Sequence, residues 1–148
     1  MSWRIFEKNN PELAALGFQQ LNRKIAYLAT IKKDGAPRLH PVGPFIGNGM
    51  LFIFTEPSSP KIRDLQRDKR YAMHSAVSRD GPLIEFLVSG EARVVIDPLV
   101  RQQAVSIAAP SIDISLYVLF DFHVARVLVV EYDQDGQPMV RRWRADKS

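Results

Sequence analysis

Short apolar runs rich in β-branched and aromatic residues recur along the chain, and turn-forming residues close each of them. This pattern predicts β-strands joined by short connections, without the strand and helix alternation of a parallel sheet. Asp34-Gly35 marks a hairpin between the first two runs, and Gly90 is a candidate bend in a long one. The first three runs are expected to form an antiparallel meander. The six or seven predicted strands are Ile25–Ile31, Arg38–Val42, Met50–Thr55, Tyr71–Val77, Leu83–Ile96, Leu116–Tyr132 and, as an additional candidate, Met139–Arg144.

Three helices are predicted where a capping residue precedes a proline, at Asn10-Pro11, Ser59-Pro60 and Asp97-Pro98. The first is expected to reach Lys24 and the third Ala108. Together with the strands, these helices favour an antiparallel barrel with short helices packed at its edges. No G-x-G-x-x-G or P-loop sequence is present, which argues against a doubly wound nucleotide-binding fold.

Composition narrows the possible functions. The chain has 148 residues, which suits a single domain over 1–148, and its net charge of +4 is spread along the sequence. A nucleic-acid partner is therefore not expected. The absence of cysteine removes disulfide, iron–sulfur and thiolate chemistry, and only three histidines remain as nitrogen ligands for a metal. Without an apolar leader or membrane span in the sequence, we expect a cytoplasmic protein.

The start of the predicted helix at Pro60 contains the ingredients of a phosphate site. Ser59, Lys61 and Arg63 place a hydroxyl and two cations beside the unpaired N–H groups of a helix N-terminus. In the alternative, Ser59 only caps the helix and the cations lie on its solvated face. Arg38, at the head of the second strand, adds a guanidinium that is able to reach the same place across a barrel end.

The other polar residues give weaker signals. His40 precedes Pro41, which lacks a backbone N–H and indicates an edge strand or a bulge where the chain faces a ligand. His74 and His123 are expected to be half-buried residues of a sheet face, and no metal site is predicted. At the carboxyl end, Arg142 and Trp143 belong to a basic aromatic stretch suited to a planar or anionic substrate. The alternative is a basic tail whose tryptophan packs on the core.

In their order, these segments resemble the pyridoxamine 5'-phosphate oxidase-like family of flavin-binding split barrels, including its short general-stress members. The matching segments are Ile25–Ile31, Asp34-Gly35-Ala36-Pro37, Arg38-Leu39-His40-Pro41-Val42, Leu51–Thr55, Ser59-Pro60-Lys61-Ile62-Arg63-Asp64-Leu65, Asp68–Ala72 and Val88–Ala92. The succession is fairly specific from about residue 25 to residue 96, and the remainder matches only in its pattern of strands and helices.

The resemblance implies a split β-barrel of the antiparallel, Greek-key type that forms a homodimer and holds FMN at the subunit interface. The apolar stretch from Val118 to Val130 also favours a dimer, because it is richer than one barrel face needs. By position, Arg38 and Lys61 would contact the FMN phosphate with help from Ser59. The remaining implied cofactor-binding residues are Leu39, His40, Phe54 and Thr55, with Glu85 where relatives often carry Gln.

For function, the resemblance implies a flavin-dependent oxidoreductase acting on an unidentified small molecule, with Arg142 and Trp143 at the substrate side. Three alternatives remain. The same cations would suit the anionic tail of the deazaflavin F420, the chain could bind flavin or haem without turnover, or the scaffold could have lost its site.

Overall fold

The strand β6 (Ile84–Val94) explains why the sheet curls, because it changes partner along its length. Residues Ile84–Ser89 pair with β8 (Arg126–Tyr132), whereas Ala92–Val94 pair with β7 (Val118–Phe122). Gly90, the expected bend, stands at the exchange. A Cβ on Gly90 would collide with the carbonyl oxygen of His123, so a side chain there would push the β7–β8 connection away.

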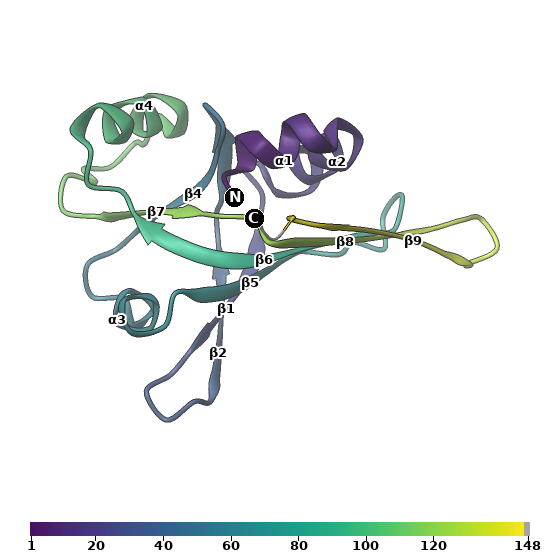
Figure 1. Cartoon of the computed structure of the whole chain (residues 1–148), viewed down its shortest axis with the longest axis horizontal. Helices are drawn as coiled ribbons and strands as arrows, with labels where there is room; N and C mark the ends of the chain where they lie inside the picture. The colour runs from purple at the N-terminus through teal and green to yellow at the C-terminus, as the bar shows by residue number, and fades with distance from the viewer. Residues whose placement is uncertain (147–148) are drawn as a thin grey trace.

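The computed structural model describes residues 1–146, which contain nine strands and four helices. Every strand pair is antiparallel, and the order β2-β1-β5-β6-β7-β4-β3 curls into an open barrel, with the β8–β9 hairpin extending from β6 (Figure 1). The mainly β architecture expected from the sequence is confirmed. The remaining strands are β1 (Ala26–Ile31), β2 (Pro37–Val42), β3 (Phe45–Gly47), β4 (Met50–Thr55), β5 (Arg70–Ser75) and β9 (Pro138–Arg144).

Two strand predictions were wrong. The run Leu116–Tyr132 is divided into β7 and β8, because the backbone at His123 and Ala125 turns to donate N–H groups to β6 at Glu91 and Ser89. The expected meander does not form either. The strand β4 pairs with β3 and β7, while β2 pairs with β1 alone among the described strands. Prolines within β2 lack backbone donors, which restricts this strand to the edge.

The helices follow their capping signals. They are α1 (Trp3–Asn9), α2 (Pro11–Leu21), α3 (Pro60–Arg67) and α4 (Pro98–Ala108). Asn10 Oδ1 accepts a hydrogen bond from Leu13 N at 3.2 Å, and Asp97 Oδ1 accepts one from Leu99 N at 2.9 Å. The helix α2 ends at Leu21, one turn before the predicted Lys24. The helix α1 was not predicted. Among the described residues, none of the helices combines the length and the apolarity needed to cross a bilayer, and the cytoplasmic location stays a prediction.

The main core lies between the concave face of the sheet and the helices α1 and α2. Trp3 and Phe6 of α1 are fully buried and pack with Phe86 of β6. A second, smaller core under α4 is built around Phe52 and Leu119. The helix α3 lies beside β1, across the molecule from α1 and α2 (Figure 1). These contacts fix the position of α3 relative to the β1–β2 hairpin.

Gly17 of α2 tests how tightly the main core is packed. A Cβ at Gly17 would lie 2.6 Å from the ring of Phe86 and 2.7 Å from the indole of Trp3, and both rings are fully buried. Helix propensity favours alanine over glycine by about 1 kcal/mol, but overpacking costs about 1–3 kcal/mol. We therefore expect Gly17→Ala to lower the free energy of unfolding in urea by about 1 kcal/mol. Ala15→Gly on the exposed face of α2 measures propensity alone. A Gly17→Ala protein more stable than the wild type would contradict this packing.

Candidate anion-binding site

The alternation of side chains along β2 decides which of its residues reach the barrel interior. Arg38 and His40 are half-buried on one face, whereas Leu39 is 69% exposed on the opposite face. Both side chains lie near α3, because Arg38 is bonded to Asp64 and the charges of Lys61 and Asp64 act on the pKa of His40. The first cation and the first histidine of the predicted site therefore point the same way.

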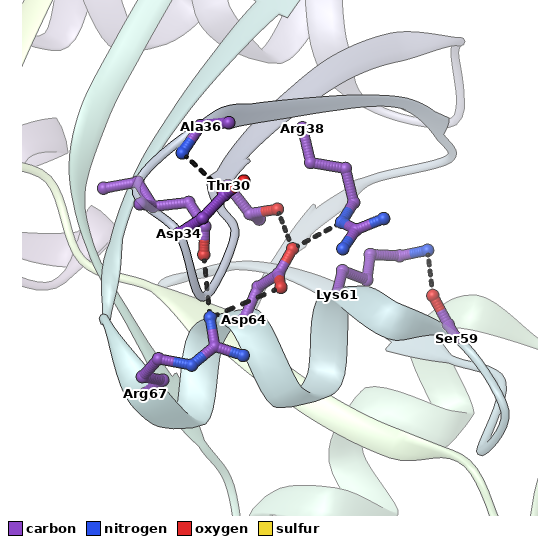
Figure 2. Close-up of polar contacts among 9 residues, drawn as sticks. Thr30, Asp34, Ala36, Arg38, Ser59, Lys61, Asp64 and Arg67 are labelled. Atoms are coloured by element: carbon purple, nitrogen blue, oxygen red, sulfur yellow. Dashed lines mark hydrogen bonds and ion pairs between the residues drawn. The ribbon is translucent and has the colours of Figure 1, made fainter.

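The carboxylate of Asp64 on α3 holds Arg38 in place. Its Oδ2 accepts a hydrogen bond of 2.7 Å from Arg38 Nε and one of 2.8 Å from Thr30 Oγ1, as Figure 2 shows. Arg67 Nη1 lies 3.7 Å from the other carboxylate oxygen. Asp64 is 2% exposed and Arg38 is 29% exposed. Arg38 donates to Asp64 through Nε, and its two Nη groups have no hydrogen-bond partner among the described residues.

Asp64 is ionised despite its burial. Desolvation by itself would raise the pKa of the carboxyl, but the hydrogen bonds from Arg38 and Thr30, with the charges of Arg38 and Arg67, outweigh it. The pKa of Asp64 consequently lies below its ordinary value. The ionised carboxylate orients the guanidinium of Arg38 through Nε and leaves both Nη groups free to donate to a ligand.

Lys61 occupies the first turn of α3, next to Arg38 (Figure 2). Its Nζ donates a hydrogen bond of 2.9 Å to Ser59 Oγ. Ser59 stands at the N-cap position, yet its side chain makes no capping bond, whereas Arg63 is exposed, as the alternative of a solvated helix face expected. Burial lowers the pKa of Lys61, and the carboxylate of Glu56 opposes this shift. A cation and a hydroxyl are thus held together at the helix start.

Four buried polar atoms lack a partner within residues 1–146, namely Trp3 Nε1, His40 Nε2, Thr55 Oγ1 and Asp121 Oδ1. Two of them, His40 Nε2 and Thr55 Oγ1, belong to predicted site residues. Burial lowers the pKa of His40, and the positive charges of Lys61 and Arg38 lower it further, against the carboxylate of Asp64. Buried polar atoms in folded proteins nearly always have a hydrogen-bond partner. Free donors on two cations, together with these orphaned atoms, fit a phosphorylated ligand with further hydroxyl groups.

Other predicted residues lie elsewhere in the chain. Phe54 packs against Phe52 in the core under α4, with their ring centroids 6.0 Å apart. The outward side chain of Leu39 does not join the Arg38 cluster. Glu85 Oε2 accepts a hydrogen bond of 3.2 Å from the Tyr132 hydroxyl on the far side of the sheet. In the described part of the chain, no three His, Asp or Glu side chains gather as metal ligands.

The carboxyl-terminal pair lies at the opposite end of the sheet from Arg38. The strand β9 follows β8, which pairs with β6 and not with β1 or β2. Trp143 packs on the main core, 4.8 Å from the ring of Phe6, as in the alternative that the sequence left open. Arg142 is exposed. Within one chain, neither residue reaches the cations of the predicted phosphate site.

Sequence reasoning missed Asp64 and Thr30, on which the geometry of Arg38 depends. The signal was present but slight. Asp64 lies between the buried Ile62 and Leu65 of α3, where a solvated carboxylate is not expected. Thr30 follows Ala26 and Leu28 in the inward phase of β1. A carboxylate and a hydroxyl on two buried faces indicate a buried polar contact, but only the fold shows that they meet.

Comparison with known protein families identifies the family of the chain. A family model described as pyridoxamine 5'-phosphate oxidase matches residues 15–131, most of the chain. The chain belongs to the pyridoxamine 5'-phosphate oxidase family. The match includes the segments that carry Arg38, Ser59, Lys61 and Asp64, and it confirms the resemblance found in the sequence. No curated protein matches the chain.

Solved structures of family-like proteins show the same fold at low sequence identity. A FAD-binding protein from Mesorhizobium loti is 21% identical, with a TM-score of 0.66 over 82% of this chain and 95% of its own. General Stress Protein 26 from Bacillus anthracis is 18% identical, with a TM-score of 0.64 over 89% and 97%. A heme binding protein from Mycobacterium smegmatis is 18% identical, with a TM-score of 0.66 over 86% and 55%. The curled sheet is therefore a split barrel.

The role of Asp64 predicts a stability change that depends on pH. Asp64→Asn removes a charge-assisted bond, so we expect the free energy of unfolding at neutral pH to fall by about 1.5–3 kcal/mol. Because the pKa of Asp64 is lower in the folded state, its contribution is present above the unfolded pKa and is lost as pH falls through the folded value. The difference between the two proteins should therefore shrink below about pH 4.

Urea unfolding at neutral and acidic pH measures this difference. Asp80→Asn, in the exposed turn before β6, is the matched control and should leave stability unchanged at both pH values. Equal stability of the wild type and Asp64→Asn at neutral pH would show that the buried contact contributes nothing.

Proposed function

We propose that this chain binds flavin mononucleotide and acts as a flavin-dependent oxidoreductase on a small molecule. The observation that carries the proposal is the pairing of the uncommitted Nη groups of Arg38 with Lys61 at the start of α3. Membership of the pyridoxamine 5'-phosphate oxidase family and the fold shared with a FAD-binding protein support a flavin as the ligand.

The phosphate group is the part of the ligand that the residues fit best. A guanidinium offers two parallel N–H donors to neighbouring phosphate oxygens, and an ammonium adds a point charge. The helix α3 points its N-terminus at the same place, and the helix dipole favours an anion there. Among the described residues, Arg38 and Arg67 share the single carboxylate of Asp64, and the charge of Lys61 is opposed by Glu56.

His40 and Thr55 are suited to the polar chain between the phosphate and the ring. Each has a buried polar atom without a partner in the described chain. Burial and then the charges of Lys61 and Arg38 lower the pKa of His40, which favours the neutral imidazole with one donor and one acceptor. Hydroxyl groups of a ribityl chain provide partners for both residues.

A bound flavin supplies the electron transfer, and the protein supplies binding and orientation. Arg38 and Lys61 anchor the phosphorylated end, Asp64 fixes the direction of Arg38, and Ser59 fixes Lys61. Leu39 and Phe54, which the family resemblance places near the ring, are separated from this anchor within one chain. The ring is therefore expected to be enclosed by more than one chain.

The proposal includes a homodimer, but the exposed apolar residues that favour it are not those expected from the sequence. The stretch from Val118 to Val130 places about every second side chain in the core of this chain, among them Phe120, Phe122 and Val129. The outer face of the β1–β2 hairpin instead exposes apolar side chains. Leu39 is 69% and Tyr27 43% exposed. A gathered apolar surface of this kind is typical of a protein interface.

Comparison of FMN with riboflavin, its analogue without phosphate, tests the anchor. We expect Arg38→Ala and Lys61→Ala each to weaken FMN binding by about one to two orders of magnitude, since each removes a charge-assisted contact, and to leave riboflavin binding nearly unchanged. Flavin fluorescence titration measures both affinities. Lys69→Ala, an exposed cation beyond α3, is the control. Equal FMN affinity in all four proteins, or uptake of haem or F420 in place of FMN, would contradict FMN as the cofactor.

Turnover tests the second half of the proposal. Reduction of the bound flavin by NADPH or reduced F420, followed by reoxidation by an acceptor, is expected in a stopped-flow absorbance experiment. Flavin that stays oxidised with every donor would make the chain a binding protein without oxidoreductase activity.

A homodimer formed through the outer face of the β1–β2 hairpin should dissociate when a charge is placed on that face. Light scattering at micromolar concentration should give twice the mass of the chain, and Leu39→Glu should give the monomer, because a carboxylate cannot be buried unpaired in an apolar interface. Phe18→Glu changes a residue that is 50% exposed on α2, away from that surface, and should leave the dimer intact. A wild-type monomer would overturn the dimer.

A further inference from the structure

The edge strand β9 presents arginines on both faces, and their surroundings differ. Arg141 points toward the side of the sheet that α2 covers, and its hydrogen bonds are accepted by Glu131 Oε1 of β8 at 3.0 Å and by Glu12 Oε2 of α2 at 3.5 Å. Its neighbour Arg142 points to the opposite face, because side chains alternate along a strand. Arg141 therefore has carboxylate partners inside the chain, which is the ordinary structural role of an arginine.

No carboxylate pairs with the arginines of the opposite face among residues 1–146. Arg126 of β8 stands directly across from Arg144 of β9, and Arg142 is two residues along the same strand. Like charges placed opposite each other across two strands are destabilising. The carboxylate of Glu85, on β6, is hydrogen-bonded by the Tyr132 hydroxyl. The face thus concentrates three arginines that form no ion pair with a carboxylate of the described chain.

A hollow of about 410 Å³ lies among these arginines. Such a volume is within the range of small-molecule sites, roughly 300–1,000 Å³. The side chains that matter here are the apolar Leu87 and Leu128, the hydroxyl of Ser89, and Arg126, Arg142 and Arg144. Leu87 pairs with Leu128 across β6 and β8, so the two leucines are adjacent on this face. We call this feature the arginine hollow.

We propose that the arginine hollow binds a small organic carboxylate with an apolar body. The planar fork of a guanidinium matches the two oxygens of a carboxylate, and the anion removes the repulsion between Arg126 and Arg144. The apolar body covers Leu87 and Leu128, which gains burial for both. This site lies apart, within one chain, from the Arg38 and Lys61 cluster. It gives a chemical class to the substrate that the family resemblance places beside Arg142, and in that role it rests on the proposed function, whereas ligand binding to the hollow is measured without flavin.

Calorimetric titration of the full chain with 2-naphthoate tests the proposal. We expect binding by the wild type, and a weakening of about tenfold or more in Arg142→Gln and in Arg144→Gln, because each loses a charge-assisted contact. Arg141→Gln is the matched control, since its side chain lies on the other face of the same strand and should leave the affinity unchanged. Amide chemical shifts of Leu87 and Leu128 should move on titration in the wild type.

The uncharged 2-naphthamide and 2-naphthyl phosphate separate the parts of the recognition. Naphthamide should bind at least tenfold more weakly than naphthoate. Three results would overturn the proposal: no binding of naphthoate, equal binding of naphthamide, or equal effects of Arg141→Gln and Arg142→Gln. Tighter binding of the naphthyl phosphate would replace the carboxylate by a phosphate as the ligand class. Displacement of naphthoate by FMN in an Arg38→Ala/Lys61→Ala protein would assign the arginine hollow to the flavin.

Discussion

The contact between Asp64 and the β1–β2 hairpin is the interaction on which the candidate site depends. One buried carboxylate joins three elements, since Thr30 belongs to β1, Arg38 to β2 and Asp64 itself to α3. It positions the helix start that carries Lys61 and fixes a guanidinium by Nε with its fork uncommitted. Burying a charge is costly unless it is well paired, and here the pairing also prepares a cation for an anionic ligand.

Strand alternation divides the molecule into two chemically different faces. On β2, Arg38 and His40 turn to the barrel interior while Leu39 stays exposed. On β9, Arg141 finds carboxylates on one face and Arg142 finds none on the other. A period of two residues is thus enough to put the proposed phosphate anchor inside the barrel and an apolar, basic surface outside it.

What could be predicted from the sequence was mostly local. The capping residue and proline at Asp97-Pro98 predicted the start of α4, since their effect depends on neighbours in the chain. The meander failed because strand pairing is decided by distant partners, and β4 pairs with β7 rather than with β2. Arg38, Ser59 and Lys61 were predicted as site residues from their motifs, whereas the contact of Asp64 with Arg38 becomes visible only when α3 is placed against β1. The segments that resemble the family predicted a split barrel, whereas capping and turn residues alone did not determine how the strands pair.

A crystal structure of the protein grown with FMN is the most direct test of the central claim. The account predicts phosphate oxygens within hydrogen-bonding distance of the Arg38 Nη groups and of Lys61 Nζ, with the Asp64 contact to Arg38 Nε preserved. FMN bound with its phosphate elsewhere, while Arg38 and Lys61 face bulk water, would contradict it.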